Sequence, residues 1–162
     1  MSVIVKKMET DDEIRGKAYV HRQSWQEAYA GIVDPAYLEK LTPEKCEAMA
    51  FRWRDNVLVA KEGDRVIGFA GYGACRDEDA KDAGTVFAIY ILAEYYGQGV
   101  GYRLMQAALE ELCDYPRVAV WVLADNARAI RFYRRCGFLP DGREQTVHLG
   151  TDLTEIRMML TR

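Results

Sequence analysis

A glycine-rich segment is the part of this sequence best suited to bind a ligand. Gly97, Gly99 and Gly101 occupy alternate positions directly after an apolar run at residues 86–92 and directly before a helical pattern. A strand that turns through glycines into a helix directs several unpaired backbone N–H groups at one point, with the positive end of the helix dipole behind them. Glycine lets the backbone approach an anion closely and adopt a positive φ. The segment therefore predicts a phosphate-binding turn, or else a helix start that binds no ligand.

Two common nucleotide-binding motifs do not fit this segment. The phosphate loop of nucleoside triphosphatases has Lys and then Ser or Thr after its last glycine, whereas Tyr102 and Arg103 follow Gly101 here. The dinucleotide fingerprint has a third glycine three residues after its second, and that position holds Tyr102 or Leu104, depending on the starting glycine. The sequence also offers no obvious set of Mg²⁺ ligands, so a nucleotide-phosphate enzyme is disfavoured.

A second segment, residues 125–138, has the pattern of a capped helix that follows another apolar run. Asp125 or Asn126 can cap the start of this helix, and Gly137 is placed to end it. Asn126, Ala129, Ile130 and Tyr133 share one helical face. By itself this face is also typical of a helix that simply buries Ile130 and Tyr133 in a core.

The two segments together resemble the GNAT superfamily of N-acetyltransferases. Residues 96–101 resemble its pyrophosphate motif, Gln/Arg-x-x-Gly-x-Gly/Ala, except that Tyr96 replaces the first residue. Residues 126–138 resemble its second motif, Asn-x-x-Ala-x-x-x-Tyr-x-x-x-Gly-Phe. The resemblance is strongest over about residues 60–140, and the motifs occur in the family's order.

This resemblance implies a mixed α/β, GNAT-like acyl-CoA N-acyltransferase fold: a central, mostly antiparallel sheet flanked by helices, with its fourth and fifth strands splayed apart. It also implies acetyl-CoA as donor. The pantetheine would pair with the backbone of residues 89–91, and the pyrophosphate would lie on the N–H groups of residues 98–102. The cofactor-binding residues implied are Ile89, Tyr90, Ile91, Tyr96, Gly97, Gln98, Gly99, Val100, Gly101, Tyr102, Asn126, Ala129 and Tyr133.

The same resemblance assigns roles to side chains. Tyr133 would be the catalytic general acid near the sulfur, and Asn126 would form a hydrogen bond with the cofactor. Many family members carry a carboxylate early on the fourth strand that acts as the general base, and Thr85 stands at that position here. The base could instead be a water chain or another carboxylate such as Glu27, or the enzyme could have no dedicated base. The arginines at positions 128, 131, 134 and 135 are either solvated or in contact with the adenosine phosphate.

The acceptor is expected to be the primary amine of a small molecule such as a polyamine. Residues 24–32 resemble the branch that includes bacterial polyamine acetyltransferases, and Trp25 and Tyr29, one helical turn apart, could pack an acceptor or belong to the core. A net charge of −3 is compatible with a cationic acceptor. A protein N-terminal or lysine acetyltransferase and a non-catalytic, acyl-CoA-sensing module are the alternatives.

Composition narrows the class of protein. The chain has 162 residues, 49% of them hydrophobic and 29% charged, which favours one domain over residues 1–162. No apolar run approaches the roughly 20 residues of a membrane span. The apolar part of the N-terminal segment is too short for a secretory signal. No block of basic residues suggests nucleic-acid binding. The four cysteines are scattered, so a metal site is not expected. We expect a cytoplasmic protein, and the resemblance allows a homodimer.

The elements that position these residues can be predicted from hydrophobic periodicity. Strands are expected at residues 2–8, 57–60, 66–72, 85–92, 118–123, 138–149 and 152–160, the last two as an antiparallel pair around Gly150. Helices are expected at residues 10–29, 35–41 and 43–53, from the glycine segment to Tyr115, and after Asn126. The charged stretch at residues 76–82 is expected to be a solvated loop.

Overall fold

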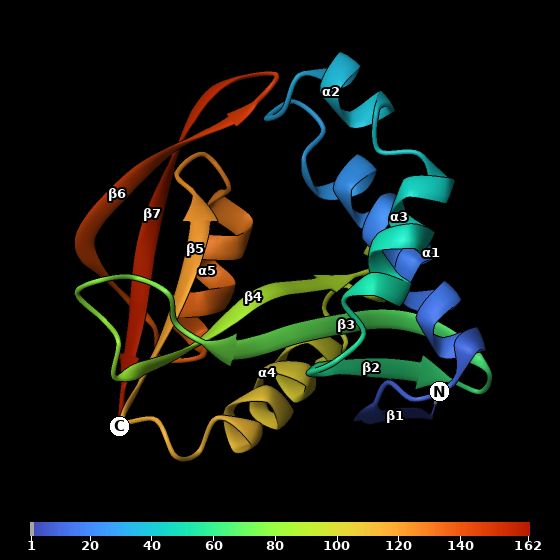
Figure 1. Cartoon of the computed structure of the whole chain (residues 1–162), viewed down its shortest axis with the longest axis horizontal. Coiled ribbons are helices and arrows are strands. Elements are labelled where there is room, and N and C mark those ends of the chain that lie inside the picture. The colour runs from blue at the N-terminus through green and yellow to red at the C-terminus, as the bar shows by residue number, and fades with distance from the viewer. Residues whose placement is uncertain (1) are drawn as a thin grey trace.

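A seven-stranded sheet supports every other element of the molecule (Figure 1). The computed structural model describes residues 2–162. The strands are β1 (Val3–Lys7), β2 (Val57–Glu62), β3 (Arg65–Ala74), β4 (Ala83–Ile91), β5 (Arg117–Leu123), β6 (Leu139–Leu149) and β7 (Thr151–Thr161). Their order is β1-β2-β3-β4-β5-β7-β6, and only β4 and β5 are parallel neighbours. The expected mixed α/β fold with a mostly antiparallel sheet is therefore confirmed.

The fourth and fifth strands separate soon after they meet. They pair only where Ala83–Thr85 faces Arg117–Ala119. Beyond that point β4 stays paired with β3 as far as Ile91, while β5 stays paired with β7 as far as Leu123. Figure 1 shows the two strands leaving their common end in different directions. The predicted splay is confirmed, and it leaves one edge of β4 without a strand partner.

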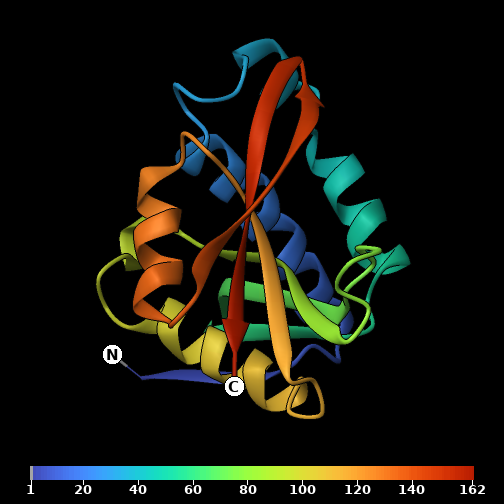
Figure 2. The same cartoon turned by 90° about the vertical axis from the view of Figure 1, so that its left-hand side faces the viewer.

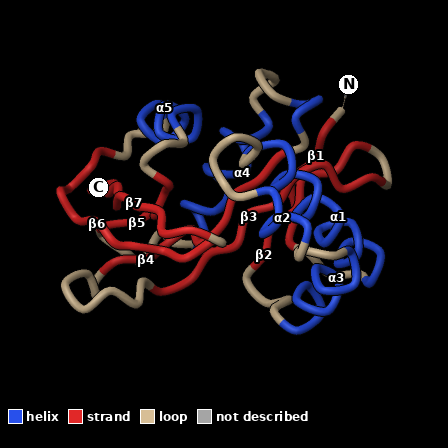
Figure 3. Tube along the Cα trace, turned by 90° about the horizontal axis from the view of Figure 1, so that it is seen from above, coloured by secondary structure: helices blue, strands red, loops and turns tan. Residues whose placement is uncertain are grey.

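Helices cover both faces of the sheet (Figure 3). They are α1 (Asp11–Ala28), α2 (Pro35–Glu39), α3 (Pro43–Arg52), α4 (Val100–Glu111) and α5 (Ala127–Arg135), with one 3₁₀ turn at Ala93–Tyr95. Lys17 of α1 lies over the Phe69 ring, whereas Leu104 of α4 lies beside Gly68. Because consecutive strand residues point to opposite faces, α1 and α4 lie on opposite sides of β3. None of the helices within residues 2–162 is both long and apolar enough to cross a membrane.

Local signals account for where several helices begin and end. Thr10 and Glu13 form a reciprocal capping box at the start of α1, and Thr42 caps α3 ahead of Pro43. The helix that follows the glycine segment ends at Glu111, earlier than the expected Tyr115. The reason is a tight turn, in which the Tyr115 N–H donates to the Leu112 carbonyl at 3.0 Å.

The stretch at residues 76–82 is not a freely solvated loop, so that expectation is wrong. Asp77 and Asp79 both accept hydrogen bonds from Arg157 of β7, whose side chain is buried. Asp82 accepts two hydrogen bonds from Arg117. The buried guanidinium requires carboxylate partners, and the loop supplies them.

The β6–β7 hairpin extends across the molecule to the second helix (Figures 1 and 2). Its turn residue, Gly150, has φ +82°, and a Cβ there would lie 3.0 Å from the Cβ of Tyr37. Below this turn a small apolar cluster joins Val33, Leu38 and Leu123, with Tyr29 packed against it. The hairpin therefore closes one end of the space between β4 and β5.

Candidate active site

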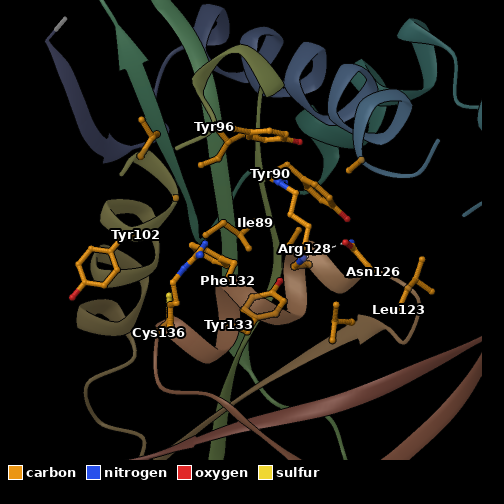
Figure 4. Close-up of a pocket in the computed structure, with 18 of the residues that line it drawn as sticks. Ile89, Tyr90, Tyr96, Tyr102, Leu123, Asn126, Arg128, Phe132, Tyr133 and Cys136 are labelled. Atoms are coloured by element: carbon orange, nitrogen blue, oxygen red, sulfur yellow. Dashed lines mark hydrogen bonds between the residues drawn. The ribbon is translucent and has the colours of Figure 1, made fainter. Parts of the chain in front are cut away.

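A cleft of about 650 Å³ occupies the space that the splayed strands leave (Figure 4). Most residues predicted to bind the cofactor line this cleft: Ile89, Tyr90, Ile91, Tyr96, Gly97, Gly99, Val100, Gly101, Tyr102, Asn126, Ala129 and Tyr133. Gln98 is not on its wall, because its side chain turns back to the Glu94 carbonyl. Of the two predicted acceptor residues, Tyr29 lines the cleft, whereas Trp25 lies against Tyr29 without lining it.

The glycine loop presents a row of free backbone donors. Gly97 and Gly99 have φ of +76° and +79°, a conformation that other residues adopt only with strain. The first hydrogen bond that closes α4 is donated by Arg103 to the Gly99 carbonyl. Within the described chain, no backbone or side-chain acceptor is bonded to the N–H groups of residues 97–102. This array at a helix N-terminus can bind a diphosphate.

Gly101 is required for a different reason, which is space. A Cβ at this position would lie 3.1 Å from the Phe132 ring and 3.2 Å from Ile91 Cδ1. The start of α4 can therefore pack closely against both α5 and the end of β4. This close packing fixes the free N–H groups relative to the cleft.

Tyr133 brings a phenol into the cleft from α5 (Figure 4). The residue is only 8% exposed, and its ring packs edge-on against Phe132 and Phe138. Burial, and then the neighbouring ionisable groups, raise the pKa of the Tyr133 hydroxyl well above that of a free phenol. No residue among those described forms a hydrogen bond with this hydroxyl. The phenol thus stays protonated near neutral pH and is free to donate.

The opposite wall carries a cluster of aromatic side chains. The Tyr29 and Tyr90 hydroxyls are 2.8 Å apart, and His21 and Trp25 pack around them. Burial, followed by the charge of Lys17, lowers the pKa of His21 to about 4, so this imidazole is neutral near pH 7. The cluster therefore offers hydroxyl groups and aromatic faces, but no positive charge, to the cleft.

The structure shows which of the carboxylates considered as a general base line the cleft. Thr85 is buried and donates to the Ala119 carbonyl, and Glu27 accepts from the Ala93 N–H instead of lining the cleft. Glu155 of β7, which the sequence did not single out, does line it. Its position depends on the register that places it opposite Leu123, the last residue of β5. No local motif carries that signal.

Comparison with known proteins identifies the family. Residues 11–138 match the family described as "Acetyltransferase (GNAT) family". The chain belongs to the GNAT family. The uncharacterized N-acetyltransferase YuaI of Bacillus subtilis is 33% identical over 130 residues, which cover 76% of this chain and 73% of YuaI. The spermine/spermidine N(1)-acetyltransferase of B. subtilis is 33% identical over 87 residues, which cover 50% of this chain and 57% of that enzyme.

The GNAT fold is equally clear from solved structures. The crystal structure of PaiA N-acetyltransferase from Thermoplasma acidophilum in complex with coenzyme A matches with a TM-score of 0.76 at 22% identity, over the whole length of both chains. The predicted GNAT-like fold is therefore confirmed. As a family member, the chain is an acetyl-CoA-dependent N-acetyltransferase.

The GNAT pyrophosphate motif departs from its usual form at Tyr96, and the structure shows what accompanies the change. The guanidinium carbon of Arg128, on α5, lies 3.2 Å from the centre of the Tyr96 ring. Arg128 and Arg135 both line the cleft, whereas Arg131 and Arg134 do not. A positive charge therefore stands beside the glycine loop of this GNAT protein, and it comes from α5 and not from the loop itself.

Asn126 has a structural use in addition to its place on the cleft wall. Its Oδ1 accepts a hydrogen bond from the Ala129 N–H at 3.2 Å and caps α5. Among residues 2–162, its side-chain amide nitrogen has no acceptor. The sequence left open whether Asp125 or Asn126 caps this helix, and the structure shows that Asn126 does.

Proposed function

We propose that this enzyme transfers the acetyl group of acetyl-CoA directly to a primary amine of a small cationic molecule such as a polyamine. One observation carries the proposal: a single cleft joins a row of free backbone N–H groups at one end to the unbonded hydroxyl of Tyr133. A direct transfer needs both an anion site for the donor and a proton donor at the reacting bond.

The cleft suits the donor in shape and chemistry. The free N–H groups of residues 97–102 suit the diphosphate, and Arg128 adds a positive charge beside them. The unpaired edge of β4 at residues 89–91 offers peptide groups to the amides of a pantetheine arm. Acetyl-CoA bound in this way would supply a thioester whose carbonyl carbon is open to attack by an amine.

Tyr133 is proposed as the residue that protonates the leaving sulfur. Its raised pKa keeps the hydroxyl in the donor form, and the absence of another hydrogen-bond partner within the described chain leaves that donor available. The acceptor must lose a proton before it attacks, since a lysine-like amine has a pKa of about 10.4. Backbone N–H groups of the splayed strand can polarise the carbonyl.

Three observations support a small cationic acceptor. One relative is named a spermine/spermidine acetyltransferase, and this chain has a net charge of −3. The wall beyond Tyr133 carries the Tyr29 and Tyr90 hydroxyls together with aromatic faces, which suit an alkyl-ammonium chain.

Binding and turnover test the proposal separately. Acetyl-CoA at about 100 times its dissociation constant should stabilise the fold by about 2.7 kcal/mol, which a thermal-shift assay detects as a higher melting temperature. Release of coenzyme A is then followed with a panel of polyamines, amino acids, aminoglycosides and peptide amines. Turnover with polyamines supports the proposal. Turnover with peptide N-termini alone would replace it by a protein acetyltransferase, and binding without any turnover would favour an acyl-CoA sensor.

A further inference from the structure

The cleft wall carries positive charge from one helix and negative charge from one strand. Arg128 and Arg135 are its only lysine or arginine residues among those described, and both come from α5. Glu155 is the only aspartate or glutamate on the same wall. The wall therefore offers positive charge to an anionic donor and a single negative charge to another ligand.

Glu155 is held in place by a neighbour on the same hairpin. Gln145 of β6 faces it in the strand register, and Gln145 Nε2 donates to Glu155 Oε1 at 2.7 Å. This bond fixes one carboxylate oxygen and leaves Oε2 free. Throughout residues 2–162, no Lys, Arg or His forms an ion pair with Glu155. A half-buried carboxylate with one oxygen fixed and no cation beside it is suited to bind a cationic ligand.

Glu155 also lies close to the groups that surround the reaction. Burial is the main cause of the raised pKa values of Tyr29 and Tyr133, and the negative charge of Glu155 raises both further. The carboxylate therefore stands near Tyr29 of the aromatic cluster and near the proposed acid.

We propose that Glu155 binds a second ammonium group of the acceptor and so selects amines that carry two positive charges. This inference rests on the proposed function, because it concerns the acceptor of that same reaction. An ammonium that pairs with a carboxylate is stabilised in its protonated form, which cannot attack a carbonyl. The amine that reacts must therefore be a different one. Tyr29 and Tyr90 line the same cleft and offer aromatic surface to the alkyl chain that joins the two amines.

The test compares diamines with monoamines of equal chain length. Initial rates are measured at low ionic strength with putrescine against n-butylamine and cadaverine against n-pentylamine, for the wild-type enzyme and Glu155→Gln. We expect the wild type to prefer each diamine, and Glu155→Gln to reduce the ratio of diamine to monoamine kcat/KM by about tenfold or more. The kcat/KM for each monoamine should fall less than that for the matching diamine.

Glu144→Gln is the matched control. Glu144 lies on the exposed part of β6, and strand alternation places it on the face opposite Gln145. The Glu144→Gln variant removes one negative charge from the same hairpin without changing the cleft wall, so the diamine preference should persist.

Each other outcome has a distinct meaning. Equal wild-type activity with diamines and monoamines would overturn the role of Glu155 and leave the proposed function intact. An equal loss for both substrates in Glu155→Gln would show that the carboxylate acts on the reacting amine, which also overturns the inference. Failure to acetylate any small amine would reject the proposed function and this inference with it.

Discussion

Tyr133 combines rigid packing with a free hydroxyl, and these two properties can be separated by mutation. Tyr133→Phe keeps the ring that packs against Phe132 and Phe138 but removes the proton donor. We expect kcat to fall by about a hundredfold, in the range of a lost general acid, while the dissociation constant for acetyl-CoA stays unchanged. Steady-state kinetics and calorimetric titration measure the two quantities.

The control is Tyr19→Phe, which removes a hydroxyl from an exposed tyrosine on α1 outside the cleft. Its kcat should equal that of the wild type. A Tyr133→Phe enzyme with normal turnover would show that another group or solvent protonates the sulfur.

A second prediction at the scale of single residues concerns the contact between Arg128 and Tyr96. The Tyr96 ring holds the Arg128 guanidinium beside the glycine loop, so in the proposed donor site each residue acts partly through the other. Arg128→Ala should raise the KM for acetyl-CoA by about tenfold, with a smaller effect at high salt because the interaction is electrostatic. The kcat should change little.

Two further variants test the coupling. Tyr96→Leu should also raise this KM, and the double variant should be less impaired than the two single effects predict together. Arg131→Ala, on the same helix but off the cleft wall, is the charge-matched control. Strict additivity of Arg128→Ala and Tyr96→Leu would mean that the stacking has no role in donor binding.

At the scale of elements, the features predicted from sequence are those set by neighbouring residues. Thr10 and Glu13 are three residues apart and specify the start of α1, and Gly99 specifies the turn into α4. The place of Glu155 on the cleft wall and the ion pairs of Arg157 with the loop at residues 76–82 depend instead on the pairing of β7 with β5. Sequence spacing does not encode that register. The lining of the cleft at the glycine loop was therefore predictable, whereas Glu155, the only carboxylate on its wall among the described residues, was not.

Glu13 links three elements and gives the stability of this end of the fold a pH dependence. Its carboxylate accepts hydrogen bonds from Lys6 of β1, Lys61 of β2 and the backbone at the start of α1. Burial by itself raises the pKa of Glu13, but these bonds outweigh it and lower the pKa from 4.5 to about 2. A carboxyl whose folded pKa is depressed stabilises the fold above its unfolded pKa, and this contribution is lost as the pH falls.

Glu13→Gln should therefore destabilise the protein by about 3 kcal/mol near neutral pH, because the change leaves two lysines without their buried partner. Urea unfolding at a series of pH values measures the difference between the variant and the wild type. The difference should stay constant above about pH 5 and shrink between the unfolded and folded pKa values, 4.5 and about 2. Glu9→Gln, which removes an exposed partner of Lys6, should change stability by less than about 1 kcal/mol. A difference that does not vary with pH would contradict this account.

At the scale of the whole molecule, the splay that creates the cleft also weakens the sheet. The half that contains β1 to β4 meets the half that contains β5 to β7 through a short parallel pairing. Arg157 reinforces this junction: its guanidinium binds Asp77 and Asp79 from the loop before β4, and Asp141 from β6. Trp121 of β5 donates to Asp77 as well. The cluster therefore joins both halves at the end where they touch.

Arg157→Met should destabilise the protein by about 3 kcal/mol, because it leaves carboxylates around a buried site without their cation. Unfolding in urea is followed by tryptophan fluorescence, to which Trp121 at the cluster contributes, and by far-UV circular dichroism of the whole sheet. In the wild type the two signals should change together, whereas loss of the junction should separate them. Arg143→Met removes an exposed arginine that lies 3.7 Å from Asp79, and it should leave both curves nearly unchanged. If Arg157→Met unfolds like the wild type, the parallel pairing and the shared core hold the halves together, and the cleft does not depend on this cluster.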